Sequence, residues 1–169
     1  DLSDIIYSIA PTDTPFMSGV AKEQATNTTH EWQTDSLADV AANAAVEGAD
    51  ITYGTMSATT KLNNNTQIST KGIQVSGTND AVTSAGRNSE LAYQVAKAAK
   101  ELKRDMETAL LSNVAKATGN ATTARKLGGL PTWIATNVDA GSGGSGSGGG
   151  SGRTDGTQRA FTEDQLKGV

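Results

Sequence analysis

The sequence predicts an α+β fold in which two extended segments precede one long helix. Side chains alternate between two faces over residues 28–35 and again over residues 66–76, as they do in β-strands. Apolar residues then recur every three or four positions from Ser89 to Gly119, which is the spacing of an amphipathic helix. These patterns divide the chain into five segments, which are residues 1–27, 28–80, 81–119, 120–161 and 162–169.

The apolar content is low for a chain of this length. It has 10 Leu, 7 Ile, 9 Val and 2 Phe, or 28 of the 169 residues, which is below the roughly 20% found in chains that form a core. The net charge of −4 is too small for a typical disordered chain. We therefore expect a chain that folds but completes its burial against neighbouring molecules.

Composition also limits the chemistry that the chain can perform. There is no cysteine, so no disulfide and no thiolate site is possible, and a reducing compartment such as the host cytoplasm fits. The single histidine, His30, lies on a strand-like segment, and no nucleophile elbow occurs. We predict no enzyme activity and no catalytic, cofactor-binding or metal-binding residues. No run of about 18 apolar residues predicts a membrane span.

Charge and glycine content exclude two further kinds of site. The sequence pI of 4.9 argues against a protein whose main task is to grip nucleic acid, and only Lys97 to Arg104 concentrates positive charge. The run AGSGGSGSGGGSG, residues 140–152, lacks the ending of a phosphate-binding loop. We interpret it as a native flexible loop within one chain.

The first segment contains a short amphipathic pattern. Leu2, Ile5, Ile6 and Ile9 share one helical face, and Pro11 ends the pattern. Nine residues are too few for a stable isolated helix, so this one must lie on its own domain or on a neighbouring chain. Phe16 and Met17 supply the next apolar anchor.

The second segment is expected to form an extended hairpin. Its first strand, residues 28–35, places His30, Trp32 and Thr34 on one face, and alternation resumes at Ile51 and Tyr53. Its second strand is expected over residues 66–76, with a bulge at Gly72. The intervening NNN at residues 63–65 is interpreted as a turn or loop. Such a hairpin has too little apolar surface to be stable alone.

The long helix and the segments after it carry local signals for their ends. Asn88 or Ser89 can cap the helix and Gly119 can end it, while LGGLPTWI, residues 127–134, is expected to pack back on it. Thr162 and Gln165 match a capping box, so a further helix begins at Thr162. Because this pattern starts so near the last residue, we expect the 169 residues to be part of a longer polypeptide.

The order of these parts resembles the HK97-like fold of the major capsid proteins of tailed phages. The wording of DLSDIIYSIAPTDTPFMSG, THEWQTDSL, QVSGTNDAV, SELAYQVAKAAKELKRDMETALLSN, GNATTARKLGGLPTWI and TDGTQRAFTEDQLK is similar to the SU10-type branch of that fold. The resemblance implies an N-terminal arm (1–27), an E-loop hairpin (28–80), the spine helix of the P-domain (81–119), a Gly/Ser-rich loop region (120–161) and the start of a further helix (162–169), with most of the A-domain lacking.

The resemblance also implies a function and partners. It implies a virion protein, assembled in the host cytoplasm, that forms the hexamers and pentamers of an icosahedral shell around loosely and non-specifically held DNA. Portal, scaffolding and decoration proteins remain open as further partners, and a membrane is not expected. Neither Lys61 nor Asn63 matches a crosslinking motif, so no covalent crosslink is predicted. The residues expected to contact neighbouring subunits are Leu2, Ile5, Ile6, Ile9, Phe16, Met17, Trp32, Ile51 and Tyr53.

Two alternatives stay open at the level of the sequence. An encapsulin-like compartment would share the fold and enclose cargo enzymes instead of DNA. An extracellular adhesin-type domain would fit the Thr, Ser, Asn and Gly content, but the long amphipathic helix argues against it.

Overall fold

The structure is a computed structural model that describes residues 13–82, 88–146 and 148–167. Helices and strands are both present, which confirms the α+β class. The elements, in chain order, are α1 (Pro15–Gly19), β1 (Thr29–Thr34), β2 (Thr60–Asn65), α2 (Gly77–Ala81), α3 (Glu90–Leu111), the 3₁₀ turn η1 (Leu130–Thr132) and α4 (Glu163–Lys167).

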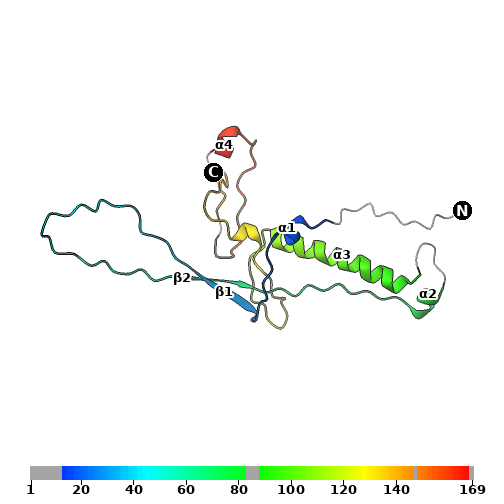
Figure 1. The fold of residues 1–169 in the computed structure, drawn as a ribbon. Helices are drawn as coiled ribbons and strands as arrows, with labels where there is room; N and C mark the ends of the chain where they lie inside the picture. The colour runs from blue at the N-terminus through cyan, green and yellow to red at the C-terminus, as the bar shows by residue number, and fades with distance from the viewer. Residues whose placement is uncertain (1–12, 83–87, 147, 168–169) are drawn as a thin grey trace.

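The molecule is extended and has very little interior. The hairpin of β1 and β2 continues into a wide loop on one side, while α3 runs to the other side (Figure 1). We call this loop, residues 35–59, the excursion. Among the described residues, Ala98 is the one buried hydrophobic side chain, and the buried polar side chains are Asn65, Glu90 and Thr132. The low apolar content therefore leaves most large side chains at least partly exposed.

The hairpin forms, but its second strand lies earlier than predicted. β1 pairs with β2 in antiparallel register, with Thr29 opposite Asn65, Trp32 opposite Leu62 and Thr34 opposite Thr60. The prediction of a paired strand over residues 66–76 is wrong. Alternation indicates extended backbone but does not specify its partner, and this segment runs alongside α3 instead (Figure 1).

A single lysine fastens the extended segment to α3. The Lys71 ammonium lies 3.1 Å from the Asp105 carboxylate and 3.6 Å from that of Glu101. The hydrogen bond and the charge of Asp105 raise the pKa of Lys71 above its ordinary value. Two acidic side chains of α3 are therefore neutralised within the chain.

The long helix begins where predicted and ends earlier. The Ser89 hydroxyl accepts a hydrogen bond from the N–H of Ala92 at 3.2 Å, which confirms Ser89 as the N-cap. The helix ends at Leu111 after 22 residues, so the prediction that it continues to Gly119 is wrong. Residues 112–119 leave the helix because their backbone pairs elsewhere: Ala117 forms a bridge with Lys126, and Lys116 N–H bonds to Gly150.

Two five-residue helices were not predicted, because neither is long enough to show a helical period. α1 starts at Pro15, which suits the first turn of a helix. α2 is capped by the Ser76 hydroxyl, which accepts from the N–H of Asn79 at 3.2 Å. The capping box at the end of the chain is confirmed, since the Gln165 side chain accepts from the N–H of Thr162 at 2.8 Å and α4 follows.

Close backbone approaches explain several glycines after α3. Gly150 has φ +84° and is buried against the Lys116 stem and the Trp133 ring. Gly144 and Gly156 both face the carbonyl oxygen of Ala140, which leaves no room for a Cβ. The glycine run thus follows a defined hydrogen-bonded path within the chain, including a bridge between Ser145 and Thr154.

Gly129→Ala is expected to lower the free energy of unfolding by roughly 1–3 kcal/mol, the cost of an overpacked site. Gly129 is buried where η1 meets the end of α3, and an added Cβ would overlap the Ser112 carbonyl oxygen. Urea denaturation followed by circular dichroism measures the loss. The control is Gly72→Ala, since nothing lies within 4 Å of a Cβ at Gly72. Equal losses in the two variants would contradict the packing argument.

Asp80 is expected to make stability depend on acid pH. Its carboxylate accepts from the Leu91 N–H and from the Ser89 hydroxyl, each at 3.1 Å, and these bonds lower the pKa of Asp80 below its ordinary value. The contribution of a carboxyl with a lowered pKa is present above its ordinary pKa of about 3.9 and is lost as pH falls through the folded value.

The measurement is the free energy of unfolding of wild type and Asp80→Asn between about pH 6 and pH 2. The variant should show a smaller loss at the acid end. Asp39→Asn, in the exposed excursion, is the control and should retain the wild-type pH profile. A profile of Asp80→Asn that matches wild type would contradict the assignment.

Candidate functional site

The described residues carry no constellation for catalysis or metal binding. They contain no group of three or more His, Cys, Asp or Glu side chains that could hold a metal ion. His30 is exposed on β1, and its ring centroid lies 5.9 Å from that of Trp32. Within the same residues, no helix is both long and apolar enough to cross a membrane. The surfaces of the chain are therefore the features that remain to be explained.

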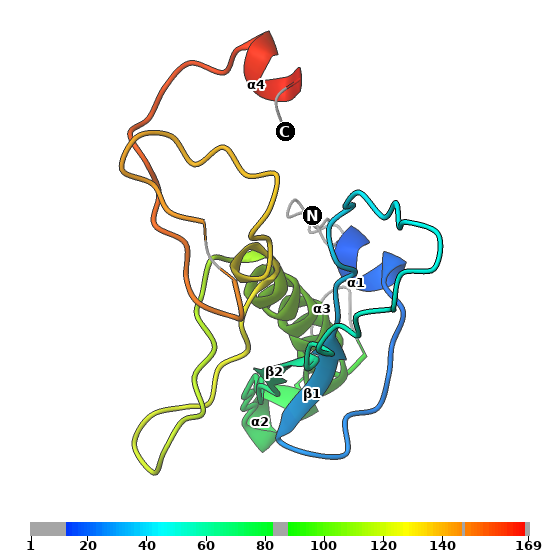
Figure 2. The same cartoon turned by 90° about the vertical axis from the view of Figure 1, so that its left-hand side faces the viewer.

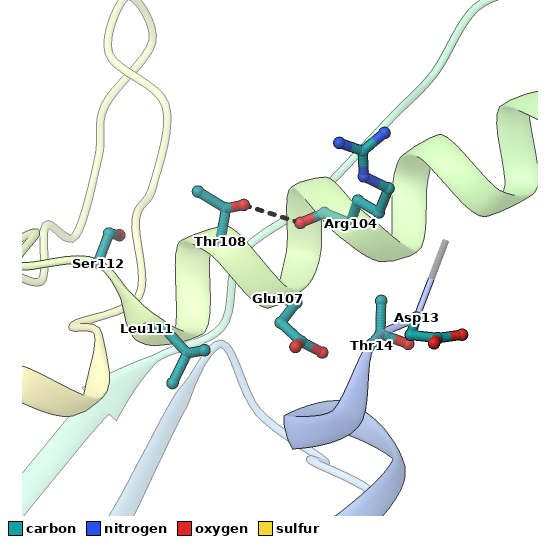
Figure 3. Close-up of a pocket in the computed structure, with 7 residues that line it drawn as sticks. All are labelled: Asp13, Thr14, Arg104, Glu107, Thr108, Leu111 and Ser112. Atoms are coloured by element: carbon teal, nitrogen blue, oxygen red, sulfur yellow. Dashed lines mark hydrogen bonds between the residues drawn. The ribbon is translucent and has the colours of Figure 1, made fainter. Parts of the chain in front are cut away.

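One shallow pocket lies between α1 and α3 (Figure 3). It has a volume of about 380 Å³ and is lined by Asp13, Thr14, Arg104, Glu107, Thr108, Leu111 and Ser112. The Glu107 carboxylate accepts hydrogen bonds from the N–H groups of Phe16 and Met17, at 3.4 and 3.2 Å. This pocket is the seam where the N-terminal region is held on the long helix, and it contains no nucleophile beside a base.

The predicted contact residues fall into three places. Leu2, Ile5, Ile6 and Ile9 lie outside the described residues. Phe16 and Met17 lie half-buried on α1, beside α3. Ile51 and Tyr53 lie on the excursion, where 79% and 90% of their surfaces are exposed. Trp32 is half-buried within the chain, so the structure does not bring the nine residues into one surface.

Trp32 packs against a residue far along the sequence. Its ring centroid lies 5.0 Å from that of Trp133, with the ring planes tilted by 56°. The Trp133 indole N–H donates to the Gly128 carbonyl at 3.1 Å, and the Lys116 ammonium lies 5.4 Å from the Trp133 ring. Aromatic pairs and cation–π contacts of this kind each contribute about 0.5–1.5 kcal/mol.

The three asparagines of β2 complete this junction, and sequence analysis misread them as a turn. Asn63 accepts from the Lys116 ammonium through its backbone and side-chain oxygens, both at 2.8 Å. Asn64 accepts from the Gly128 N–H at 2.8 Å and donates to the Gly128 carbonyl at 3.2 Å, as a backbone strand would. Asn65 is buried and bonds to Thr29. We call Trp32, Asn63, Asn64, Lys116, Gly128 and Trp133 the hairpin junction.

The excursion has the opposite character to the junction. None of its residues belongs to a helix or strand, and one turn at its tip places Gly48 at φ +80°. Its large apolar side chains are almost fully exposed: Leu37 98%, Val40 105%, Val46 82%, Ile51 79%, Tyr53 90% and Met56 97%. Contiguous exposed apolar surface on this scale is typical of an interaction site.

Comparison with known proteins identifies the family. The model of the SU10 major capsid protein family matches residues 1–169. The chain belongs to this family. It is also 45% identical, over 112 residues, to the major capsid protein of Escherichia phage Phieco32, an alignment that covers 66% of this chain and 32% of that protein. The alignment therefore spans about a third of the length of that relative.

Membership in the SU10 major capsid protein family confirms the resemblance found in the sequence. It places the chain among the structural proteins of the phage virion, and neither the compartment nor the adhesin alternative is favoured. The exposed excursion and the buried hairpin junction then belong together, since the junction fixes the direction in which a contact surface is presented.

Lys116→Met is expected to loosen the hairpin junction and to lower the free energy of unfolding by about 1–3 kcal/mol. Methionine keeps an apolar stem against Gly150 but removes both hydrogen bonds to Asn63. Near-ultraviolet circular dichroism should also lose the signal of the coupled Trp32 and Trp133 rings. The control is Lys61→Met, which removes only an exposed ion pair with Glu31. An unchanged aromatic signal in Lys116→Met would contradict the role of the ammonium.

Proposed function

We propose that this chain forms the intersubunit contacts of an icosahedral phage head, in which copies assemble as hexamers and pentamers around packaged DNA. The observation that carries the proposal is the excursion, which exposes six large apolar side chains on a rigidly anchored hairpin. Family membership supports the same role.

We also propose that the fold is HK97-like. In this interpretation residues 1–27 are the N-terminal arm, residues 28–80 the E-loop, residues 81–119 the spine region of the P-domain, residues 120–161 the loop region and residues 162–169 the start of a further helix. Three features support it: the two-stranded hairpin ending in a long loop, the 22-residue α3 of roughly 33 Å, and the seating of α1 on that helix.

Burial between subunits supplies the free energy for assembly. Each fully buried Ile, Leu, Val or Met side chain is worth about 1.5–3 kcal/mol relative to exposure. The excursion cannot gain this energy from its own chain, because it extends away from the body (Figures 1 and 2). A neighbouring copy can cover it, and a closed shell repeats the contact in every subunit.

The charge of the chain fits loose enclosure of DNA. A net charge of −4 gives little overall attraction for phosphate, so the DNA is held by confinement and by non-specific contacts. Strong binding to an acidic polymer is not required of this segment.

Ile51→Ser combined with Tyr53→Ser is expected to abolish or strongly reduce shell formation without unfolding the subunit. Both side chains are exposed, so their loss costs little within one chain but removes apolar contact between chains. Negative-stain electron microscopy and sedimentation measure assembly. Thr52→Ala with Thr55→Ala, in the same exposed loop, is the matched control and should assemble normally.

Deletion of residues 1–17 tests the arm separately. It should leave soluble subunits that do not form shells, because it removes the apolar residues of the arm together with the Phe16 and Met17 contacts to Glu107. Normal shells from both the deletion and the excursion variant would overturn the proposed function.

A further inference from the structure

We propose that the excursion of one copy binds a cationic stripe on α3 of a neighbouring copy, the stripe being Lys100, Lys103 and Arg104. The inference rests on the proposed function, and it adds the surface that receives the excursion and the electrostatic rule that aligns the two.

The cationic stripe consists of exposed side chains without internal counter-charges. Lys100, Lys103 and Arg104 are three and four positions apart, so they share one side of α3. None of them makes an ion pair within residues 13–82, 88–146 and 148–167. Neighbouring like charges on a helix are destabilising by a few tenths of a kcal/mol per pair, so the stripe favours an acidic partner.

The carboxylates of α3 that could neutralise the stripe are already engaged. Lys71 holds Glu101 and Asp105 on another side of the helix. Glu107 accepts from the N–H groups of α1, and the Arg104 side chain extends away from it (Figure 3). Packing of the chain on its own helix thus consumes negative charge and leaves positive charge exposed.

The excursion carries the complementary charge. Residues 35–59 contain four carboxylates, from Asp35, Asp39, Glu47 and Asp50, and no Lys or Arg. All four residues are exposed and are interspersed with the exposed apolar side chains described above. The excursion is therefore both acidic and apolar, which is unusual for a solvated loop.

The surface beside the cationic stripe matches this mixed character. Ala92, Ala96 and Ala99 are exposed and lie in line with Lys103 along the helix, and the exposed side chains of Leu91 and Val95 adjoin them. Small side chains permit close approach of an extended chain. Apolar contact and opposite charges can therefore form together on this side of α3.

The pairing must join two copies. The excursion and α3 extend in opposite directions from the hairpin junction in both views (Figures 1 and 2). The junction fixes the hairpin through Asn63 and Asn64, so the excursion cannot fold back onto its own helix. Nucleic acid is a weaker candidate for the stripe, because three cations stand against a net charge of −4.

The test is a charge swap in the protein as its natural reading frame encodes it. Lys100→Glu with Lys103→Glu should lower the yield of shells by about tenfold at low salt, since opposite charges become like charges. Adding Asp39→Lys and Asp50→Lys should restore most of that yield. Lys22→Glu with Lys167→Glu makes the same change in net charge at exposed positions outside the stripe and should assemble as wild type does. Circular dichroism of each variant checks that it is folded, and Lys100→Gln with Lys103→Gln is the milder substitute.

The outcomes separate this inference from the proposed function. Normal assembly of the stripe variant, or loss of assembly that the excursion reversal does not rescue, overturns the pairing while wild-type shells still support the proposed function. Normal shells that no longer retain duplex DNA would assign the stripe to nucleic acid and also overturn the pairing. Absence of shells from the wild-type protein under all conditions would contradict the proposed function itself.

Discussion

The hydrogen bonds from the Lys116 ammonium to Asn63 fix the geometry on which the rest of this chain depends. They join β2 to the segment that follows α3, and the Asn64 side chain adds two further bonds to Gly128. The Trp32 and Trp133 rings close the same junction. Without it, the two-stranded hairpin would have no fixed direction, since it makes little apolar contact of its own.

A polar junction suits a subunit whose apolar side chains are reserved for neighbours. Among the described residues, only Ala98 is a buried hydrophobic side chain, whereas the excursion leaves Leu37, Val40 and Met56 almost fully exposed. Hydrogen bonds and close glycine contacts position the chain, and burial between copies is left to stabilise the shell. This division makes folding and assembly parts of one process.

Local signals in the sequence predicted some elements well and others poorly. Ser89 capped α3 and Thr162 preceded α4 as expected, because a cap depends on side chains within one turn. The end of α3 could not be found in this way. Residues 112–119 have no strong breaker before Gly119, and they leave the helix because Ala117 and Lys116 pair with distant backbone.

The sequence alone determined the α+β class, the strand at Trp32, the start of the long helix and, by resemblance, the family to which the chain belongs. Only the tertiary structure decided that β1 pairs with Thr60–Asn65, that the asparagines of β2 fasten the hairpin, and that the acids of α3 are taken up internally. The reason is physical: periodicity and capping act over neighbouring residues, whereas strand pairing and charge neutralisation depend on partners that lie far away along the chain.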